Sequence, residues 1–182
     1  KTWVKHDRPY KAGYEYLLAY KITVPIYDYT VEFCNRCSPY APARPSSPSF
    51  PPLSSARTFD QMIQAARSGM QNIPEGYKQQ SLAGYIKLAG VARGSIEELL
   101  KDYLAYARQN KIAVWDKERV RREIRESREI WEILTKTPTL PTPPAFPALP
   151  NNLEQAINLL VDLTTQAGYL QDRLIASLKE KF

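Results

Sequence analysis

The chain has 182 residues, of which 43% are hydrophobic and 24% charged, a composition typical of a folded globular protein and not of a disordered one. It contains no apolar run near the roughly 18 residues of a membrane span and no signal-peptide pattern, so we expect one soluble, cytoplasmic domain over residues 1–182. Its net charge of +6 suits contact with RNA or DNA as well as plain solubility, and its single histidine, His6, disfavours histidine-based catalysis.

The first long helix is predicted over residues 14–36, where apolar side chains recur at helical spacing. Pro25 is expected to kink it one turn in, because proline lacks a helix N–H group. Cys34 and Cys37 close this segment, and without further cysteines they are expected to be ordinary thiols and not a zinc or redox site. The predicted inward stripe is Leu17, Tyr20, Val24, Tyr27, Val31 and Cys34.

A proline-rich tract follows over residues 38–53, with prolines at every third position from 39 to 51, the period of a polyproline II rod. A second tract covers 137–150. Each could dock in an aromatic groove of a partner or serve as a stiff connector on the domain surface, and the second interpretation is favoured. Apolar residues within the tracts indicate that both pack back onto the helices: Tyr40, Phe50, Leu53, Leu140, Phe146 and Leu149.

The second helix is predicted over residues 57–77, although Gly69, Pro74 and Gly76 are residues that helices usually avoid. Gly69 is expected to let a neighbouring helix approach, and Pro74 costs little near a helix end. Gly76 is expected to end the helix in the left-handed conformation. The apolar stripe is Phe59, Met62, Ile63, Ala66, Met70, Ile73 and Tyr77.

The third helix is predicted over residues 82–109, with Ser81 as its N-cap. Gly90 and Gly94 form a flat strip, which serves either tight packing between the second and third helices or a subunit interface; both remain open. The inward residues are Tyr85, Ile86, Ala89, Ala92, Ile96, Leu99, Leu100, Tyr103 and Ala107.

Acidic residues gather on the third helix at Glu97, Glu98 and Asp102. Such a cluster can bind a cation, but pairing with an arginine of the neighbouring helix is favoured, and Arg67 is the natural partner. Arg67 and Glu75 are further expected to hold the corner between the two helices by ion pairs and side-chain caps.

A fourth helix, over 117–135, has dense alternating charges and a thin apolar stripe, so it is expected to brace the outside of the fold. Asn151 or Asn152 is expected to cap the last helix, over 151–181, whose stripe runs from Leu153 to Leu178. No segment alternates with period two. The predicted fold class is therefore all-α: an antiparallel up-and-down four-helix bundle with an extra peripheral helix and two proline-rich connectors.

The strings DQMIQAARSGMQNIPEGYKQQS and IKLAGVARGSIEELLKDYLAYAR resemble the four-helix-bundle family encoded by intervening sequences of bacterial 23S rRNA genes, in particular its suffix-domain variant. A relative is the accessory variability determinant of diversity-generating retroelements. The variant also has helices similar to LLAYKITVPIYDYTVEFCNR and TTQAGYLQDRLIASLKEKF. The proline tracts, and Pro74 where alanine is common, depart from the pattern. The most specific residues are Arg67, Ser68, Gln71, Asn72, Ile73, Glu75 and Gly76.

This resemblance implies a four-helix protomer, a ring-shaped homopentamer and no known enzymatic activity. For the retroelement relative it implies a basic barrel that binds nucleic acid and a reverse transcriptase. Phosphate-loop and zinc-protease motifs are absent from the sequence, and neither a metal nor a cofactor is expected.

Two functions follow from the sequence. The first is a nucleic-acid-binding accessory subunit, acting as a homo-oligomer beside a reverse transcriptase, with phosphates neutralised by Arg57, Lys78, Lys87 and Arg93. The second is a scaffold that contacts protein alone, through the glycine strip and the proline tracts. Tyrosines near the start of the chain either stack on single-stranded nucleic acid or, as favoured here, close one end of the helices: Tyr10, Tyr14, Tyr16 and Tyr20.

Overall fold

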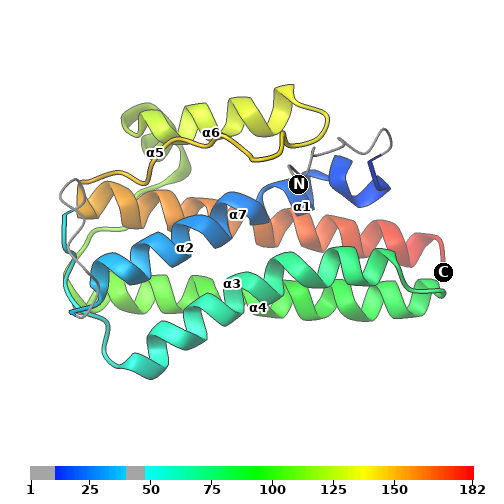
Figure 1. Cartoon of the computed structure of the whole chain (residues 1–182), viewed down its shortest axis with the longest axis horizontal. Coiled ribbons are helices and arrows are strands. Elements are labelled where there is room, and N and C mark those ends of the chain that lie inside the picture. The colour runs from blue at the N-terminus through cyan, green and yellow to red at the C-terminus, as the bar shows by residue number, and fades with distance from the viewer. Residues whose placement is uncertain (1–10, 40–47) are drawn as a thin grey trace, which may run out of the picture.

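A computed structural model describes residues 11–39 and 48–182, and these residues form helices without any β-strand (Figure 1). The all-α fold class is confirmed. His6, Tyr10 and residues 40–47 of the first proline tract, Tyr40 among them, lie outside the described residues. The elements are η1 (Gly13–Tyr16), α1 (Leu18–Lys21), α2 (Thr23–Cys37), α3 (Ala56–Tyr77), α4 (Leu82–Gln109), α5 (Lys117–Glu123), α6 (Arg125–Lys136) and α7 (Leu153–Glu180).

Four helices, α2, α3, α4 and α7, make most of the contacts between elements, and we call them the main helices. They lie side by side, and the chain reverses direction from each to the next (Figure 1). The helices α5 and α6 lie over α7 and α2, on the side opposite α3 and α4. Within residues 11–39 and 48–182, no helix has the length and apolar character needed to cross a bilayer.

The core is centred on Phe33 of α2, whose ring centroid lies 5.3 Å from that of Tyr103 and 5.0 Å from that of Tyr106. The predicted stripe on this helix is wrong at Val24, Tyr27 and Val31, which are only half buried, whereas Cys34 is buried as predicted. The buried line is instead Ile22, Ile26, Tyr29, Phe33 and Cys37. The two cysteines are free and buried, and burial raises the pKa of the Cys37 thiol to about 12.

Two predicted helices are interrupted. The segment 14–36 divides into η1, α1 and α2, with one break at the extended Leu17 and another at Ile22, three residues before Pro25. The segment 117–135 divides at Ile124, which is fully buried in an extended conformation between α5 and α6. Arg128 stabilises this corner by donating to the carbonyl groups of Arg121 and Arg122 near the end of α5, at 2.7 and 2.8 Å.

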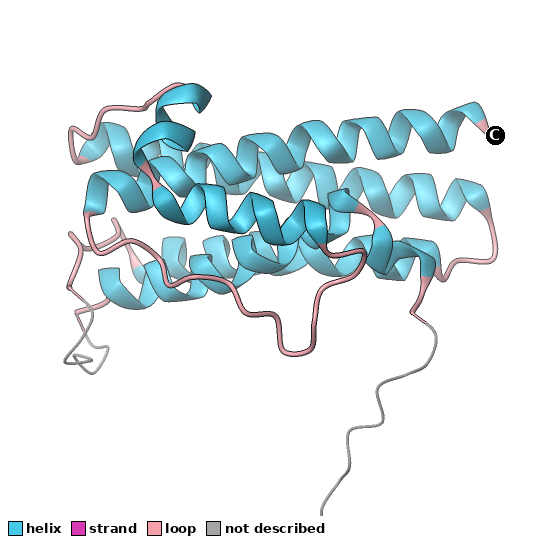
Figure 2. Ribbon diagram, turned by 90° about the horizontal axis from the view of Figure 1, so that it is seen from above, coloured by secondary structure: helices cyan, strands magenta, loops and turns pink. Residues whose placement is uncertain are grey.

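The second proline tract runs back alongside α6 to the start of α7 (Figures 1 and 2). Its carbonyl groups lack the partner strand that a sheet would supply, and polar side chains of α1 and α2 bind them instead. Tyr29 donates to the carbonyl of Pro147 at 2.6 Å, and Arg36 donates to that of Pro150 at 3.0 Å. Leu149 is buried in the core, and Leu140 and Phe146 pack against it.

Candidate nucleic-acid interface

The four cations predicted to bind phosphate do not form one compact patch. Arg57 lies in the first turn of α3 and Lys78 caps its last turn. At a rise of ~1.5 Å per residue these two positions are about 30 Å apart along the helix. Lys87 lies near the start of α4, closer to the Lys78 end, and all three of these side chains are exposed.

Arg93 is bound within the protein. Its Nε donates to Asp172 of α7 at 2.9 Å, and its Nη1 donates to Glu97 at 3.0 Å. The guanidinium group lies against Gly168, where a Cβ atom would meet it at 3.0 Å. The structure therefore places Arg93 in a contact between α4 and α7, with its charge already balanced by two carboxylates.

Two further cations, Lys101 and Arg108, extend the line of Lys87 on α4. Their spacing in multiples of seven residues places all three on one side of the helix, which also holds Gly94. Sequence reasoning missed both, although this spacing is readable in the sequence. We use the name α3–α4 face for the exposed cations of α3, of α4 and of the turn after α4: Arg57, Arg67, Lys78, Lys87, Lys101, Arg108 and Lys111.

Within the described residues, none of the cations of the α3–α4 face forms an ion pair. The opposite side of the molecule differs, because most of the cations of α5 and α6 are engaged with carboxylates, tryptophans or carbonyl groups of the same two helices and the segment before them. Arg119 pairs with Glu123 at 2.5 Å, and Arg125 pairs with Glu129 at 3.3 Å. Two arginines also stack on tryptophans: Arg119 lies 3.9 Å from the ring centroid of Trp115, and Arg121 lies 5.3 Å from that of Trp131.

Ser68 and Asn72, two of the residues most specific to the family resemblance, help to join α3 to α4. The Ser68 hydroxyl lies 2.7 Å from that of Ser95 on α4. Asn72 donates through Nδ2 to the carbonyl and the hydroxyl of Ser68, both at 2.9 Å. Asn72 thereby fixes the rotamer of a serine that bridges the two helices, which is a structural role.

The predicted left-handed cap at Gly76 is wrong. The helix continues to Tyr77, Lys78 caps it in the right-handed conformation with φ −81°, and no described glycine has a positive φ. Gly76 is needed for space, because a Cβ atom there would lie 2.7 Å from the ring of Tyr85 on α4. Gly69 has the predicted role: its Cβ would lie 2.6 Å from Ile96.

The predicted ion pairs of Arg67 are not formed. Among the described residues, Arg67 pairs with none of Glu75, Glu98 and Asp102, and it projects into solvent. Burial and the neighbouring Glu98 raise the pKa of Asp102, as expected for a carboxyl group without a cation beside it. The described residues contain no cluster of side chains that could hold a metal ion.

The strip of Gly90 and Gly94 faces open space, with no atom within 4 Å of a Cβ built at either position. Val91 beside it is 44% exposed. Of the two interpretations left open by the sequence, packing between α3 and α4 is therefore excluded for Gly90 and Gly94. The strip remains available to a neighbouring molecule.

A buried carboxylate lies between α7 and α5. Asp162 is 7% exposed and its Oδ2 atom has no hydrogen-bond partner. Burial raises its pKa, and this effect is opposed by a hydrogen bond from Gln166 and by the charges of Arg121 and Lys117. Since the folded-state pKa lies above the unfolded value, ionisation of Asp162 costs stability as the pH rises through the interval above about 4.

We expect Asp162→Asn to raise the free energy of unfolding at pH 7 by about 1 kcal/mol, because asparagine carries no buried charge. Urea unfolding at pH 7 and pH 4 measures the effect, and the gain should shrink at the lower pH, where a larger fraction of Asp162 is protonated. Asp60→Asn, at an exposed position of α3, is the matched control and should change the free energy of unfolding little. A loss of stability in Asp162→Asn at pH 7 would show that the ionised carboxylate is favourable.

Comparison of the chain with protein-family models, with curated proteins and with solved structures finds no match. The family resemblance therefore stays a prediction from the sequence. The functional argument rests on the distribution of charge over α3 and α4.

Proposed function

We propose that the protein is a non-enzymatic, homo-oligomeric nucleic-acid-binding protein, and that the α3–α4 face contacts the phosphates. The observation that carries this proposal is the contrast between the two sides of the molecule. Cations of the α3–α4 face are exposed and unpaired within the described residues, whereas those of α5 and α6 are largely engaged with carboxylates and tryptophans. Unpaired surface cations can release counterions from a phosphate backbone, which is the main source of non-specific affinity for nucleic acid.

The sequence resemblance supports the rest of the proposal. The four main helices would form an antiparallel up-and-down four-helix bundle, the protomers a homopentamer in the cytoplasm, and a reverse transcriptase would be the protein partner. A ring repeats the α3–α4 face once per subunit. The electrostatic field of the ring would therefore be several times that of one chain. The exposed Gly90 and Gly94 strip offers a surface on which a neighbouring subunit could approach closely.

The proposal predicts that the affinity for nucleic acid falls steeply as the salt concentration rises, and that this dependence arises from the cations of the α3–α4 face. We expect the triple variant Lys87→Glu, Lys101→Glu, Arg108→Glu to lose about 100-fold in affinity for a labelled RNA or DNA at about 50 mM salt. The slope of log affinity against log salt should fall by about 3, because three phosphate contacts are lost. Fluorescence anisotropy across a salt series measures both quantities.

A control of equal charge change is available on the opposite side. The variant Arg122→Glu, Arg125→Glu, Lys136→Glu alters the net charge by the same amount at exposed positions. It should retain most of the affinity. Equal losses in the two variants would show that only net charge matters, and absence of wild-type binding at low salt would overturn the proposal.

The second candidate is a scaffold that binds only protein, and the open glycine strip is the observation that favours it. This candidate predicts that a partner remains bound after nuclease treatment and that charge reversal at Lys87 leaves the complex intact. Light scattering measures the oligomeric state of the protein independently of the ligand that it binds. A monomer at micromolar concentration would contradict the homo-oligomer in either case.

A further inference from the structure

One end of the molecule carries a tyrosine that is both exposed and fixed in place. Tyr77, the last residue of α3, is 45% exposed. Its ring centroid lies 5.6 Å from that of Tyr14 and 6.1 Å from that of Tyr85, in edge-to-face geometry. Its hydroxyl group lies over Gly13, 2.6 Å from where a Cβ atom would stand. The ring is thus held by three neighbours. A molecule that stacks on it would therefore cost little further side-chain conformational entropy.

An apolar hollow of about 300 Å³ opens at the same end, where α4 begins and α7 finishes. It is lined by Ala83 and Ile86 of α4, by Lys179 of α7 and by Phe182. Phe182 is 82% exposed, so a second aromatic ring stands beside an apolar floor and an ammonium group. A flat, aromatic and anionic ligand would match these three features.

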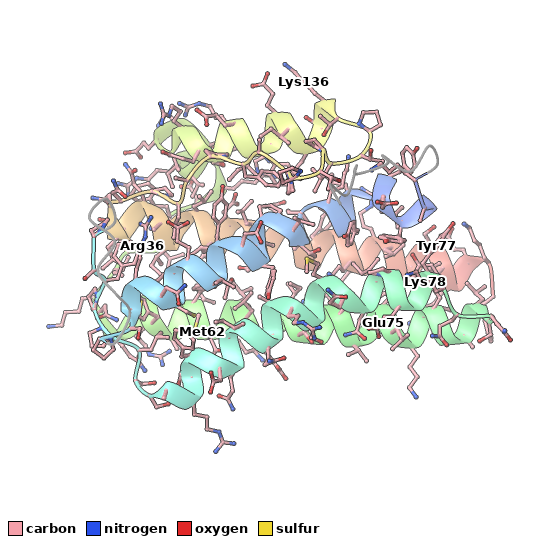
Figure 3. All side chains as sticks on the ribbon, viewed as in Figure 1. Arg36, Met62, Glu75, Tyr77, Lys78 and Lys136 are labelled. Atoms are coloured by element: carbon pink, nitrogen blue, oxygen red, sulfur yellow. The ribbon has the colours of Figure 1, made fainter. Side chains whose placement is uncertain are left out.

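Among the described residues within three positions of the last residues of α3 and α7, exposed lysines outnumber exposed acids. Lys78 follows Tyr77 directly, and both lie at the tip of α3, beside the turn that leads into α4 (Figures 1 and 3). Lys179 and Lys181 lie at the end of α7, and the exposed acids of these two described helix ends are Glu75 and Glu180. An anion would therefore be attracted to a surface whose apolar parts are aromatic.

We propose that this end of the molecule binds unpaired nucleotides. One base stacks on the exposed ring of Tyr77, another enters the hollow between Ala83 and Phe182, and Lys78 and Lys179 neutralise the phosphates. Stacking on an aromatic side chain contributes about 1–3 kcal/mol per base and requires the base to present its face, which a duplex hides. The inference rests on the proposed nucleic-acid binding and adds that single strands are the preferred form.

The test compares a labelled single strand of about 12 nucleotides with the blunt duplex of the same sequence, by anisotropy at about 50 mM salt. We expect the wild type to favour the single strand. Tyr77→Ala should weaken single-strand binding about tenfold and duplex binding less than twofold, whereas Tyr77→Phe should retain the preference. Ala83→Trp, at an exposed position, should fill the hollow and also weaken single-strand binding.

A folding defect is separated from loss of stacking by thermal unfolding of each variant and by Tyr77→Trp, whose added fluorescence a single strand should quench and a duplex should not. Equal wild-type affinity for the two forms, unchanged in Tyr77→Ala, would overturn this inference and leave nucleic-acid binding by the α3–α4 face standing. Failure of both forms to bind at low salt would instead overturn the proposed function.

Discussion

Phe33→Ala is expected to lower the free energy of unfolding by about 3–5 kcal/mol, the largest effect of any single substitution considered for this chain. Phe33 is fully buried, and its ring contacts those of Phe50, Tyr103 and Tyr106, at centroid distances of 6.0, 5.3 and 5.0 Å. These partners join α2 to α4 and to the segment that precedes α3. Removing the ring leaves a cavity that three rigid aromatic side chains cannot easily fill.

Urea unfolding followed by circular dichroism measures this effect. Phe33→Leu keeps most of the volume and should lose less than about 1.5 kcal/mol. Tyr169→Ala removes an aromatic ring that is 58% exposed on α7, and should change stability by no more than about 0.5 kcal/mol. If Phe33→Ala destabilised the protein no more than Tyr169→Ala, the aromatic cluster could not be the centre of the core.

The sequence predicts α3, α4 and α7 to within a residue or two, because each has a continuous apolar stripe and a side-chain N-cap. Ser81 accepts from the amide of Gly84, and Asn152 accepts from that of Gln155, as the capping rules predict. The inward face of α2 was predicted wrongly for a physical reason. Two apolar lines run along this helix, and which one is buried depends on the helices and the proline tract that cover it.

The candidate site was less accessible to sequence reasoning. In the sequence, Arg93 has the pattern of a free surface cation. In the structure, the packing of α7 on α4 places Asp172, 79 residues away, beside it. Arg67 reads as a partner for Glu98, yet it faces solvent. Local patterns fix which side of a helix is polar, but whether a charge is paired depends on the neighbouring helix. The line of Lys87, Lys101 and Arg108 could have been found, because it lies within one helix.

Lys21 is a residue whose burial the sequence does not suggest. A lysine is usually exposed, but Lys21 is 5% exposed beneath the end of α6. Its ammonium group donates to the carbonyls of Leu134, Thr137 and Pro138 at 2.8, 2.9 and 3.3 Å. Burial lowers its pKa. The last carbonyl groups of a helix lack internal partners and carry partial negative charge, so the ammonium both satisfies and neutralises them.

Lys21→Met, which keeps the aliphatic stem, is therefore expected to cost about 2–4 kcal/mol, because at least one buried carbonyl loses its donor together with the charge that balanced the helix end. Hydrogen exchange should show faster opening of α6 and of residues 137–150 than of α3 and α4. Lys136→Met is the matched control, since Lys136 points away from the main helices and, within residues 11–39 and 48–182, pairs only with Glu132 on its own helix (Figure 3). It should cost no more than about 0.5 kcal/mol. Equal effects of the two substitutions would show that α6 is held by its apolar residues alone, and that the ammonium group of Lys21 merely tolerates its burial.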